Sequence, residues 1–298
     1  MLKIVFGKAL LFSSIVSGRV SRILSKMAMR IAIPVNQNQM VIDSTRYDMV
    51  FADDEPYYAS QYWSIIEPYL INFPINGKIL DLGCSQGRFA MKLANKFPHA
   101  SVTACDISAS AIDQAKNYAG KSGINNIEFL VKDISSCIDD FNKDSLDLVF
   151  MTEVSIFYPG WVGDLSKIYD ALKPNGFFII SNRSQYFNSL CIVRSNKFEK
   201  IDLLLNCREG KLFESGMNFT WQTSKEVSLI LAKHNFDIVE QRGIGVCSGI
   251  TGDPHDLICR PSLINDRDKN ELMKLELEIG ASLPDAGRYI LTVAKKGN

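Results

Sequence analysis

Short apolar stretches alternate with amphipathic segments along the chain after Pro34. The first apolar stretch is "KILDLG", at residues 78–83. Beyond Gly87, apolar residues recur at helical spacing as far as Pro98, which predicts an amphipathic helix that ends there. Such an alternation is typical of a parallel sheet with helices on both faces. The hydrophobic pattern therefore predicts an α/β fold.

Six further apolar stretches complete a predicted sheet of seven strands. They are "ASVTACD" up to Asp106, "IEFLVKD" up to Asp133, "LDLVFMTE" up to Glu153, "FFIISNR" up to Arg183, "FDIVEQRGIGV" at 236–246 and "RYILTVAKK" at 288–296. Residues that favour helix N-termini stand between them, namely Ser108 and the capping box of Thr223 and Glu226. Residues 184–222 interrupt the alternation after the fifth strand, and we expect them to form a small cap over the binding face.

Residues 1–40 form a separate compositional zone. Six basic residues precede the first acidic residue, Asp43: Lys3, Lys8, Arg19, Arg22, Lys26 and Arg30. Apolar residues between them recur at roughly helical spacing, which predicts a basic amphipathic helix whose residues 1–33 contact an anionic membrane surface. The alternatives are a helix packed on its own domain, a transit peptide or a weak signal sequence. The longest uncharged run near the start, residues 9–18, is too short to span a bilayer.

Composition narrows the class of protein. Hydrophobic residues make up 46% of the 298 residues, enough for a sizeable core. Lysine plus arginine and aspartate plus glutamate number 33 each, so no global positive field favours nucleic acid as a partner. The seven cysteines form no C-x-x-C pair, which argues against a zinc site or a disulfide framework. We therefore expect a cytoplasmic protein without a metal, either free or held at the membrane face by its N-terminal segment.

The segment that follows the first strand matches part of a hydrolase template. Gly83, Ser85 and Gly87 spell G-x-S-x-G, the nucleophile elbow of α/β-hydrolases. However, only one strand precedes Ser85, and no histidine occurs before His99. The downstream order of an aspartate, Asp237 or Asp253, and then His255 keeps a serine hydrolase open as an alternative.

The same segment departs from a dinucleotide-binding loop. G-x-G-x-x-G would require glycines where Ser85 and Arg88 stand. What remains is Asp106, at the end of the second strand and 19 residues after Gly87. A carboxylate at this position accepts hydrogen bonds from both hydroxyls of an adenosine ribose. An adenosine-containing cofactor is therefore expected at the carboxyl ends of the strands.

Four motifs in order resemble one known family. "DLGCSQG", from Asp81 to Gly87, matches the pattern D/E-x-G-x-G-x-G except that Ser85 replaces the middle glycine, and "VKDI", "LDLVFMTEV" and "ALKPNGFFIISNR" follow at the family's spacing. On these motifs, residues 45–298 resemble the class I S-adenosylmethionine-dependent methyltransferases. "SNRS" resembles the corresponding stretch of quinone-biosynthesis O-methyltransferases. The resemblance implies a methyltransferase domain at 41–298 with a Rossmann-like, seven-stranded, mostly parallel sheet whose last strand is antiparallel.

The resemblance also implies how S-adenosylmethionine binds. The residues expected to contact the cofactor are Asp81, Gly83, Cys84, Ser85, Gly87, Asp106, Ile107, Asp133 and Ile134. Asp81 is expected to face the ammonium group, Asp106 the ribose and Asp133 the adenine amine, with Ile107 and Ile134 as apolar walls. Each aspartate also has a purely structural interpretation, as a strand end or a helix cap.

The sequence says less about the methyl acceptor than about the cofactor. Glu153 and His255 are candidate catalytic residues, while Tyr158, Arg183 and Tyr186 are candidate substrate contacts near the same edge. After "TEV" the chain has "SIFY" where many relatives have a leucine-glutamate-histidine run, so that histidine is missing here. We expect methyl transfer to an oxygen or nitrogen of a small molecule or glycan. The alternatives are a catalytically silent binding protein and a hydrolase that uses Ser85.

Overall fold

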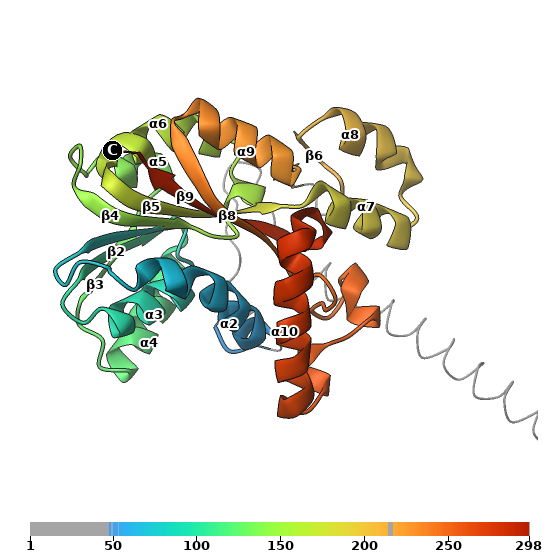
Figure 1. The fold of residues 1–298 in the computed structure, drawn as a ribbon, viewed down its shortest axis with the longest axis horizontal. Helices are drawn as coiled ribbons and strands as arrows, with labels where there is room; N and C mark the ends of the chain where they lie inside the picture. The colour runs from blue at the N-terminus through green and yellow to red at the C-terminus, as the bar shows by residue number, and fades with distance from the viewer. Residues whose placement is uncertain (1–47, 49, 53, 214–216, 298) are drawn as a thin grey trace, which may run out of the picture.

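The structure is a computed structural model that describes residues 48, 50–52, 54–213 and 217–297. Its main feature is one seven-stranded sheet between two layers of helices (Figure 1). The strands are β1 Lys78–Leu82, β2 Ser101–Asp106, β3 Ile127–Val131, β4 Leu146–Met151, β5 Leu172–Arg183, β8 Phe236–Ile244 and β9 Tyr289–Lys296. The predicted α/β fold is therefore confirmed. The predictions for residues 1–40 fall outside the described residues.

The strand order is β3-β2-β1-β4-β5-β9-β8. Strands β1 to β5 pair in parallel, and β9 pairs antiparallel with both β5 and β8. The antiparallel last strand is thus confirmed, and it lies inside the sheet instead of at its edge. Because β1 to β5 run in the same direction, their carboxyl ends meet along one edge, where ligands bind in open α/β sheets.

Alternation along each strand builds two cores. On β1, Ile79 belongs to the core below the sheet in Figure 1 and Leu80 to the core above it. The lower core contains helices α2 Glu55–Ile66, α3 Arg88–Lys96 and α4 Ala109–Lys121, and the upper core contains α5 Ile134–Ile138, α6 Trp161–Ala171 and α9 Ser224–Lys233. Apolar residues on both faces explain why the strands have nearly continuous hydrophobic sequences.

The helix N-termini follow the local sequence. The Ser108 hydroxyl accepts a hydrogen bond from the backbone of Ala111, and Thr223 and Glu226 form the predicted capping box. One strand boundary differs from the prediction, since β5 begins at Leu172 instead of Phe177. The strand continues through an irregular register beside Leu146, where the sequence pattern indicates a turn.

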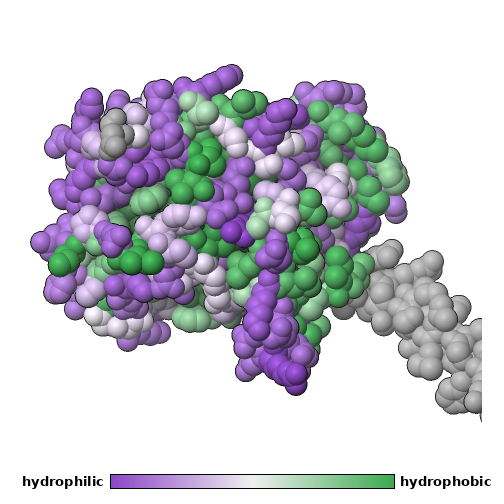
Figure 2. Space-filling view, in the orientation of Figure 1, coloured by the Kyte–Doolittle hydropathy of each residue, from purple (hydrophilic) through white to green (hydrophobic). Residues whose placement is uncertain are grey.

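The segment after β5 forms short helices and a separate two-stranded sheet. It contains α7 Gln185–Arg194, the 3₁₀ helix η3 Phe198–Lys200, α8 Ile201–Asn206 and the two-stranded pair of β6 Glu209–Gly210 and β7 Phe219–Thr220. Figure 2 shows an apolar area over α7 and α8, where Val193, Phe198 and Leu205 are each more than half exposed. Among the described helices, none has the length and apolar character needed to cross a bilayer.

Between β8 and β9 the chain forms three 3₁₀ helices and one long helix. They are η4 Pro254–Leu257, η5 Pro261–Leu263, α10 Asp266–Ser282 and η6 Pro284–Ala286. Helix α10 packs along β8, and its buried Glu276 accepts hydrogen bonds from the Tyr57 hydroxyl at 2.7 Å and the Ser248 hydroxyl at 2.9 Å. This connection therefore joins the end of the sheet to helix α2.

Candidate active site

The loop between β1 and α3 has an unusual backbone. Gly83, Ser85 and Gly87 all adopt positive φ angles, of 71°, 48° and 82°. A Cβ atom at Gly83 would lie 2.4 Å from Cγ2 of Val154, in the loop after β4. Glycine is therefore required at position 83 both by the left-handed conformation and by the close approach of the second loop.

Asp106 holds this loop at the end of β2. Its Oδ2 accepts a hydrogen bond from the backbone of Ser85 at 2.9 Å, and its Oδ1 accepts one from Ser108 at 2.8 Å. Burial raises the pKa of the Asp106 carboxyl, although these backbone donors oppose the shift. Each carboxylate oxygen can accept a second hydrogen bond. Asp106 can thus position the loop and still accept the hydroxyls of a ribose.

Asp81 is a buried carboxyl group at the start of the same loop. Only 3% of the residue is exposed, and burial raises the pKa of its carboxyl to about 7. A backbone hydrogen bond from Ala90 and the charge of Arg88 partly oppose this shift. A buried carboxylate is stabilised by a cationic partner. Asp81 therefore fits the ammonium group of S-adenosylmethionine.

Two further predicted cofactor residues lie at the ends of β2 and β3. Ile107 is 41% exposed beside Asp106, whereas Ile134 is buried at the start of α5. Asp133 is exposed, and its Oδ1 accepts a hydrogen bond from the backbone of Ser136. The side chain of Ser136, and then this backbone donor, lower the pKa of the Asp133 carboxyl. Asp133 thus caps α5. Because β2 and β3 are neighbours, these side chains share one part of the edge.

The buried Cys84 completes the loop. Its backbone N–H donates to the carbonyl of Cys105 at 2.9 Å, and this bond joins the loop to the end of β2. The glycine loop, the Asp106 carboxylate that could accept the ribose hydroxyls and the buried Asp81 carboxyl thus lie together at the carboxyl ends of β1 to β3. The residues present fit S-adenosylmethionine, with their individual contacts remaining predictions.

A buried charge cluster lies beside this place, at the ends of β1 and β4. Arg88 forms ion pairs with Glu55 at 2.5 Å and with Glu153 at 3.1 Å. Burial by itself would lower the pKa of Arg88, but the two carboxylates raise it on balance. The backbone N–H of Glu153 also donates to the Ser181 hydroxyl at 2.7 Å. Glu153 is therefore held in position from α3 and β5.

Sequence analysis did not identify Glu55, Arg88 and Tyr289 as site residues. Tyr62 lies in their neighbourhood and is 0% exposed. The charge of Glu153 acts on the hydroxyls of both tyrosines and raises their pKa values further than burial alone. No short motif connects these four positions, because they come from different parts of the chain.

Arg183 and Tyr158 occupy different surroundings. The Arg183 guanidinium stacks on the rings of Phe187 and Tyr289, at 4.6 and 4.7 Å from their centroids. In contrast, the Tyr158 hydroxyl donates to Asp164 on α6 at 2.6 Å. The structure thus brings Arg183 together with the charge cluster and places Tyr158 against α6.

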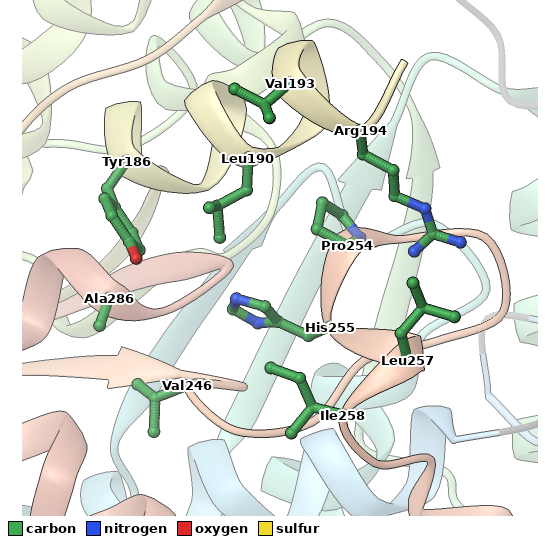
Figure 3. A pocket seen from close by; sticks show the side chains of 10 residues that line it. All are labelled: Tyr186, Leu190, Val193, Arg194, Val246, Pro254, His255, Leu257, Ile258 and Ala286. Atoms are coloured by element: carbon green, nitrogen blue, oxygen red, sulfur yellow. The ribbon is translucent and has the colours of Figure 1, made fainter. Parts of the chain in front are cut away.

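Tyr186 and His255 line a groove of about 410 Å³ (Figure 3). Its walls come from α7, η4, η6 and the residues after β8, and none of its lining residues belongs to the loops after β1, β2 or β3. The Nδ1 atom of His255 donates to the carbonyl of Gly245 at 2.9 Å. The imidazole edge also meets the ring of Phe187, with 5.2 Å between centroids. The two predicted residues therefore lie apart from the cofactor loop.

The fold and this edge define a class I S-adenosylmethionine-dependent methyltransferase. A family model described as a methyltransferase domain matches residues 75–239, more than half of the chain. The chain belongs to that family. Family membership favours methyl transfer over hydrolysis at Ser85.

Similar proteins act on varied acceptors. The malonyl-[acyl-carrier protein] O-methyltransferase of Priestia megaterium is 25% identical over 56% of this chain and 59% of its own length. The sterol 24-C-methyltransferase of Debaryomyces hansenii is 32% identical over 35% of this chain and 27% of its own. The chain thus spans less than two thirds of either relative. A Methanosarcina mazei methyltransferase structure, with a TM-score of 0.54 and 21% identity, covers 78% of this chain and 97% of its own, and it shares the fold.

Proposed function

We propose that the enzyme transfers a methyl group to an oxygen or nitrogen of a small molecule or glycan bound at the ends of β4 and β5. The observation that carries this proposal is the burial of polar side chains at that edge. Asn182 is 0% exposed and its amide oxygen has no partner among the described residues, and the buried Nε of Arg183 also lacks one there. Buried polar atoms without partners are costly, so a bound polar molecule would stabilise them.

The segment at 184–222 supports an enclosed acceptor. Thr220 donates through its hydroxyl to the carbonyl of Ser155 at 2.8 Å, and the Asn182 amide donates to Gln222 at 3.3 Å. The rings of Phe157 and Phe219 also pack together. We propose that this segment is a cap over the acceptor. A covered site suits a small molecule or the end of a glycan, and the zero net charge does not favour nucleic acid.

The named relatives leave the acceptor atom open, since one is an O-methyltransferase and another a C-methyltransferase. S-adenosylmethionine, when bound, supplies an activated methyl group for displacement by a nucleophile. Glu153 is our candidate for accepting the proton of an oxygen or nitrogen nucleophile, because Arg88 and Ser181 fix its position. His255 is a weaker candidate than Glu153, because its Nδ1 already donates to the carbonyl of Gly245 and its groove includes no residue of the loops after β1, β2 or β3.

The test is a transfer assay with a radiolabelled methyl donor and fractionated cell extracts. Small-molecule, glycan, protein and nucleic-acid fractions are incubated separately with the full chain. Label is expected in the small-molecule or glycan fraction, attached through oxygen or nitrogen when the product is analysed by mass spectrometry. Asp106→Ala serves as the control, since loss of its charged acceptor should weaken cofactor binding about tenfold or more. Label confined to protein or nucleic acid, or attached to carbon, would overturn the proposal.

A further inference from the structure

Arg183, at the carboxyl end of β5, has an incompletely paired guanidinium. Its Nη1 donates to the carbonyl of Arg288 at 3.4 Å, and the guanidinium lies over the aromatic rings of Phe187 and Tyr289. The Nε atom is buried and has no hydrogen-bond partner within the described residues. Arginine is usually bound by carboxylate or carbonyl oxygens when it is removed from water. The Nε–H of Arg183 can therefore donate a hydrogen bond to an oxygen atom of a ligand.

The neighbouring arginines differ in their charge partners. Arg88 forms ion pairs with Glu55 and Glu153, and Arg288 lies 3.0 Å from a carboxylate oxygen of Asp253. Over the ranges that the structure describes, no ion pair joins Arg183 to a carboxylate. The charges of both Arg183 and Glu153 act on the Tyr289 hydroxyl. Arg183 thus lies in the same neighbourhood as the charge cluster but without a carboxylate of its own.

Two nearly inaccessible side chains close to Arg183 in the chain also have unpaired polar atoms. Asn182 precedes Arg183 on β5 and is 0% exposed, and its amide oxygen has no partner among the described residues. Asn188 follows Phe187 on α7 and is 1% exposed, yet neither its amide nitrogen nor its amide oxygen has a partner among the described residues. Such atoms are usually satisfied by a bound polar group. They are the second observation that indicates a ligand at this edge.

We propose that the methyl acceptor carries a carboxylate and that Arg183 binds this carboxylate beneath the cap. This inference rests on the proposed function and specifies its substrate class. A planar guanidinium fork matches one carboxylate in a bidentate arrangement. A phosphate, which carries up to two negative charges, would gain less here because Arg88 and Arg288 are already paired. The rings of Phe187 and Tyr289 beside the guanidinium suit an acceptor with an apolar part next to its carboxylate.

Binding experiments on the full chain test this proposal with matched probes. Benzoate and hexanoate are compared with their methyl esters and with phenyl phosphate, with and without saturating S-adenosylhomocysteine, by ligand-observed NMR titration. At least one acid is expected to bind about tenfold or more tightly than its ester and than phenyl phosphate. Esters that bind as well as both acids, no binding by either acid, or tighter binding of phenyl phosphate would overturn the proposal. This comparison uses the unmodified protein and does not depend on any variant.

Substitutions assign the binding to Arg183. Arg183→Gln is expected to reduce acid binding about tenfold while the affinity for S-adenosylhomocysteine and for the ester is retained, and Arg183→Lys should recover part of the loss. Arg242→Gln is the control, because Arg242 is also half-buried but lies on β8 and pairs with the carboxylate of Glu240 at 3.0 Å. Unchanged acid binding in folded Arg183→Gln would refute the assignment. If the full chain binds the acids but does not bind S-adenosylhomocysteine, the Arg183 site is supported and the proposed function is overturned.

Discussion

The two halves of the site are stabilised in different ways. The cofactor half, at the ends of β1 to β3, is built from backbone: positive φ angles at Gly83, Ser85 and Gly87, and N–H groups bound by Asp106. The acceptor half, at the ends of β4 and β5, is built from side-chain charges, centred on Arg88 between two carboxylates. A site built from backbone geometry suits a cofactor that stays the same across a family. A site built from charged side chains can differ between family members that act on different substrates.

The halves also differ in how completely their polar groups are paired. In the cofactor half, the Asp106 and Asp133 carboxylates already accept backbone hydrogen bonds. In the acceptor half, Asn182 and Arg183 each have a buried atom without a partner among the described residues. We infer that the cofactor half is largely preformed and that the acceptor half is completed by its ligand.

The largest expected effect comes from removing the shared cation of the acceptor half. Arg88→Met would leave Glu55 and Glu153 buried without it, and the free energy of unfolding should fall by about 3–5 kcal/mol. Chemical denaturation measures the change. Arg208→Met is the control, because Arg208 pairs with Glu226 at the surface and should cost about 1 kcal/mol or less. Similar losses in the two variants would contradict the importance of the buried cluster.

A smaller effect is expected where the two halves touch. Gly83→Ala forces a Cβ against Val154 at a positive φ, and should cost about 2–4 kcal/mol of stability and weaken S-adenosylhomocysteine binding. Gly123→Ala isolates the backbone contribution, because Gly123 has a φ of 68° but no atom lies within 4 Å of the place that its Cβ would take, and it should cost about 1 kcal/mol. Denaturation and calorimetric titration measure both quantities. Equal costs would show that the contact between the loops is unimportant.

The pH dependence of cofactor binding tests the buried acid of the cofactor half. In the cofactor-free protein the Asp81 carboxyl has a pKa of about 7, so it is mostly protonated at pH 6. An ammonium group favours the ionised form, so binding below pH 7 must release a proton. Affinity for S-adenosylhomocysteine should therefore rise about eightfold from pH 6 to 7.5. Asp81→Asn should remove this dependence, and a flat profile in the unmodified protein would separate Asp81 from the ammonium.

The smallest effect is expected at Ser85, where only backbone strain is changed. Its φ of 48° favours glycine, so Ser85→Gly should be neutral or stabilise the loop by up to about 1 kcal/mol, with methyl transfer retained. Ser85→Ala should also keep activity but give no such gain. Thermal denaturation and the transfer assay measure the two properties. Loss of activity in both folded variants would restore a chemical role for the hydroxyl.

Local sequence was sufficient for the parts of the protein that depend on near neighbours. Periodicity predicted the strands and both cores, because a strand or helix buries residues at a fixed spacing. Ser108, Thr223 and Glu226 were recognised as caps because their partners lie three residues away. The glycine loop and Asp106 could be placed at one edge because parallel strands end together.

Tertiary structure alone decided the acceptor half. The ion pairs of Arg88 join α2, α3 and the loop after β4, and Arg183 meets Tyr289 only because β9 inserts beside β5. The pKa of Asp81 likewise depends on burial, which no local pattern specifies. Contacts between distant residues arise from how the layers pack, and the same packing excludes the water that would otherwise weaken each charge. The sequence therefore determined the fold and the loop that we expect to bind the cofactor. Tertiary packing determined which charged side chains lie together at the proposed acceptor site.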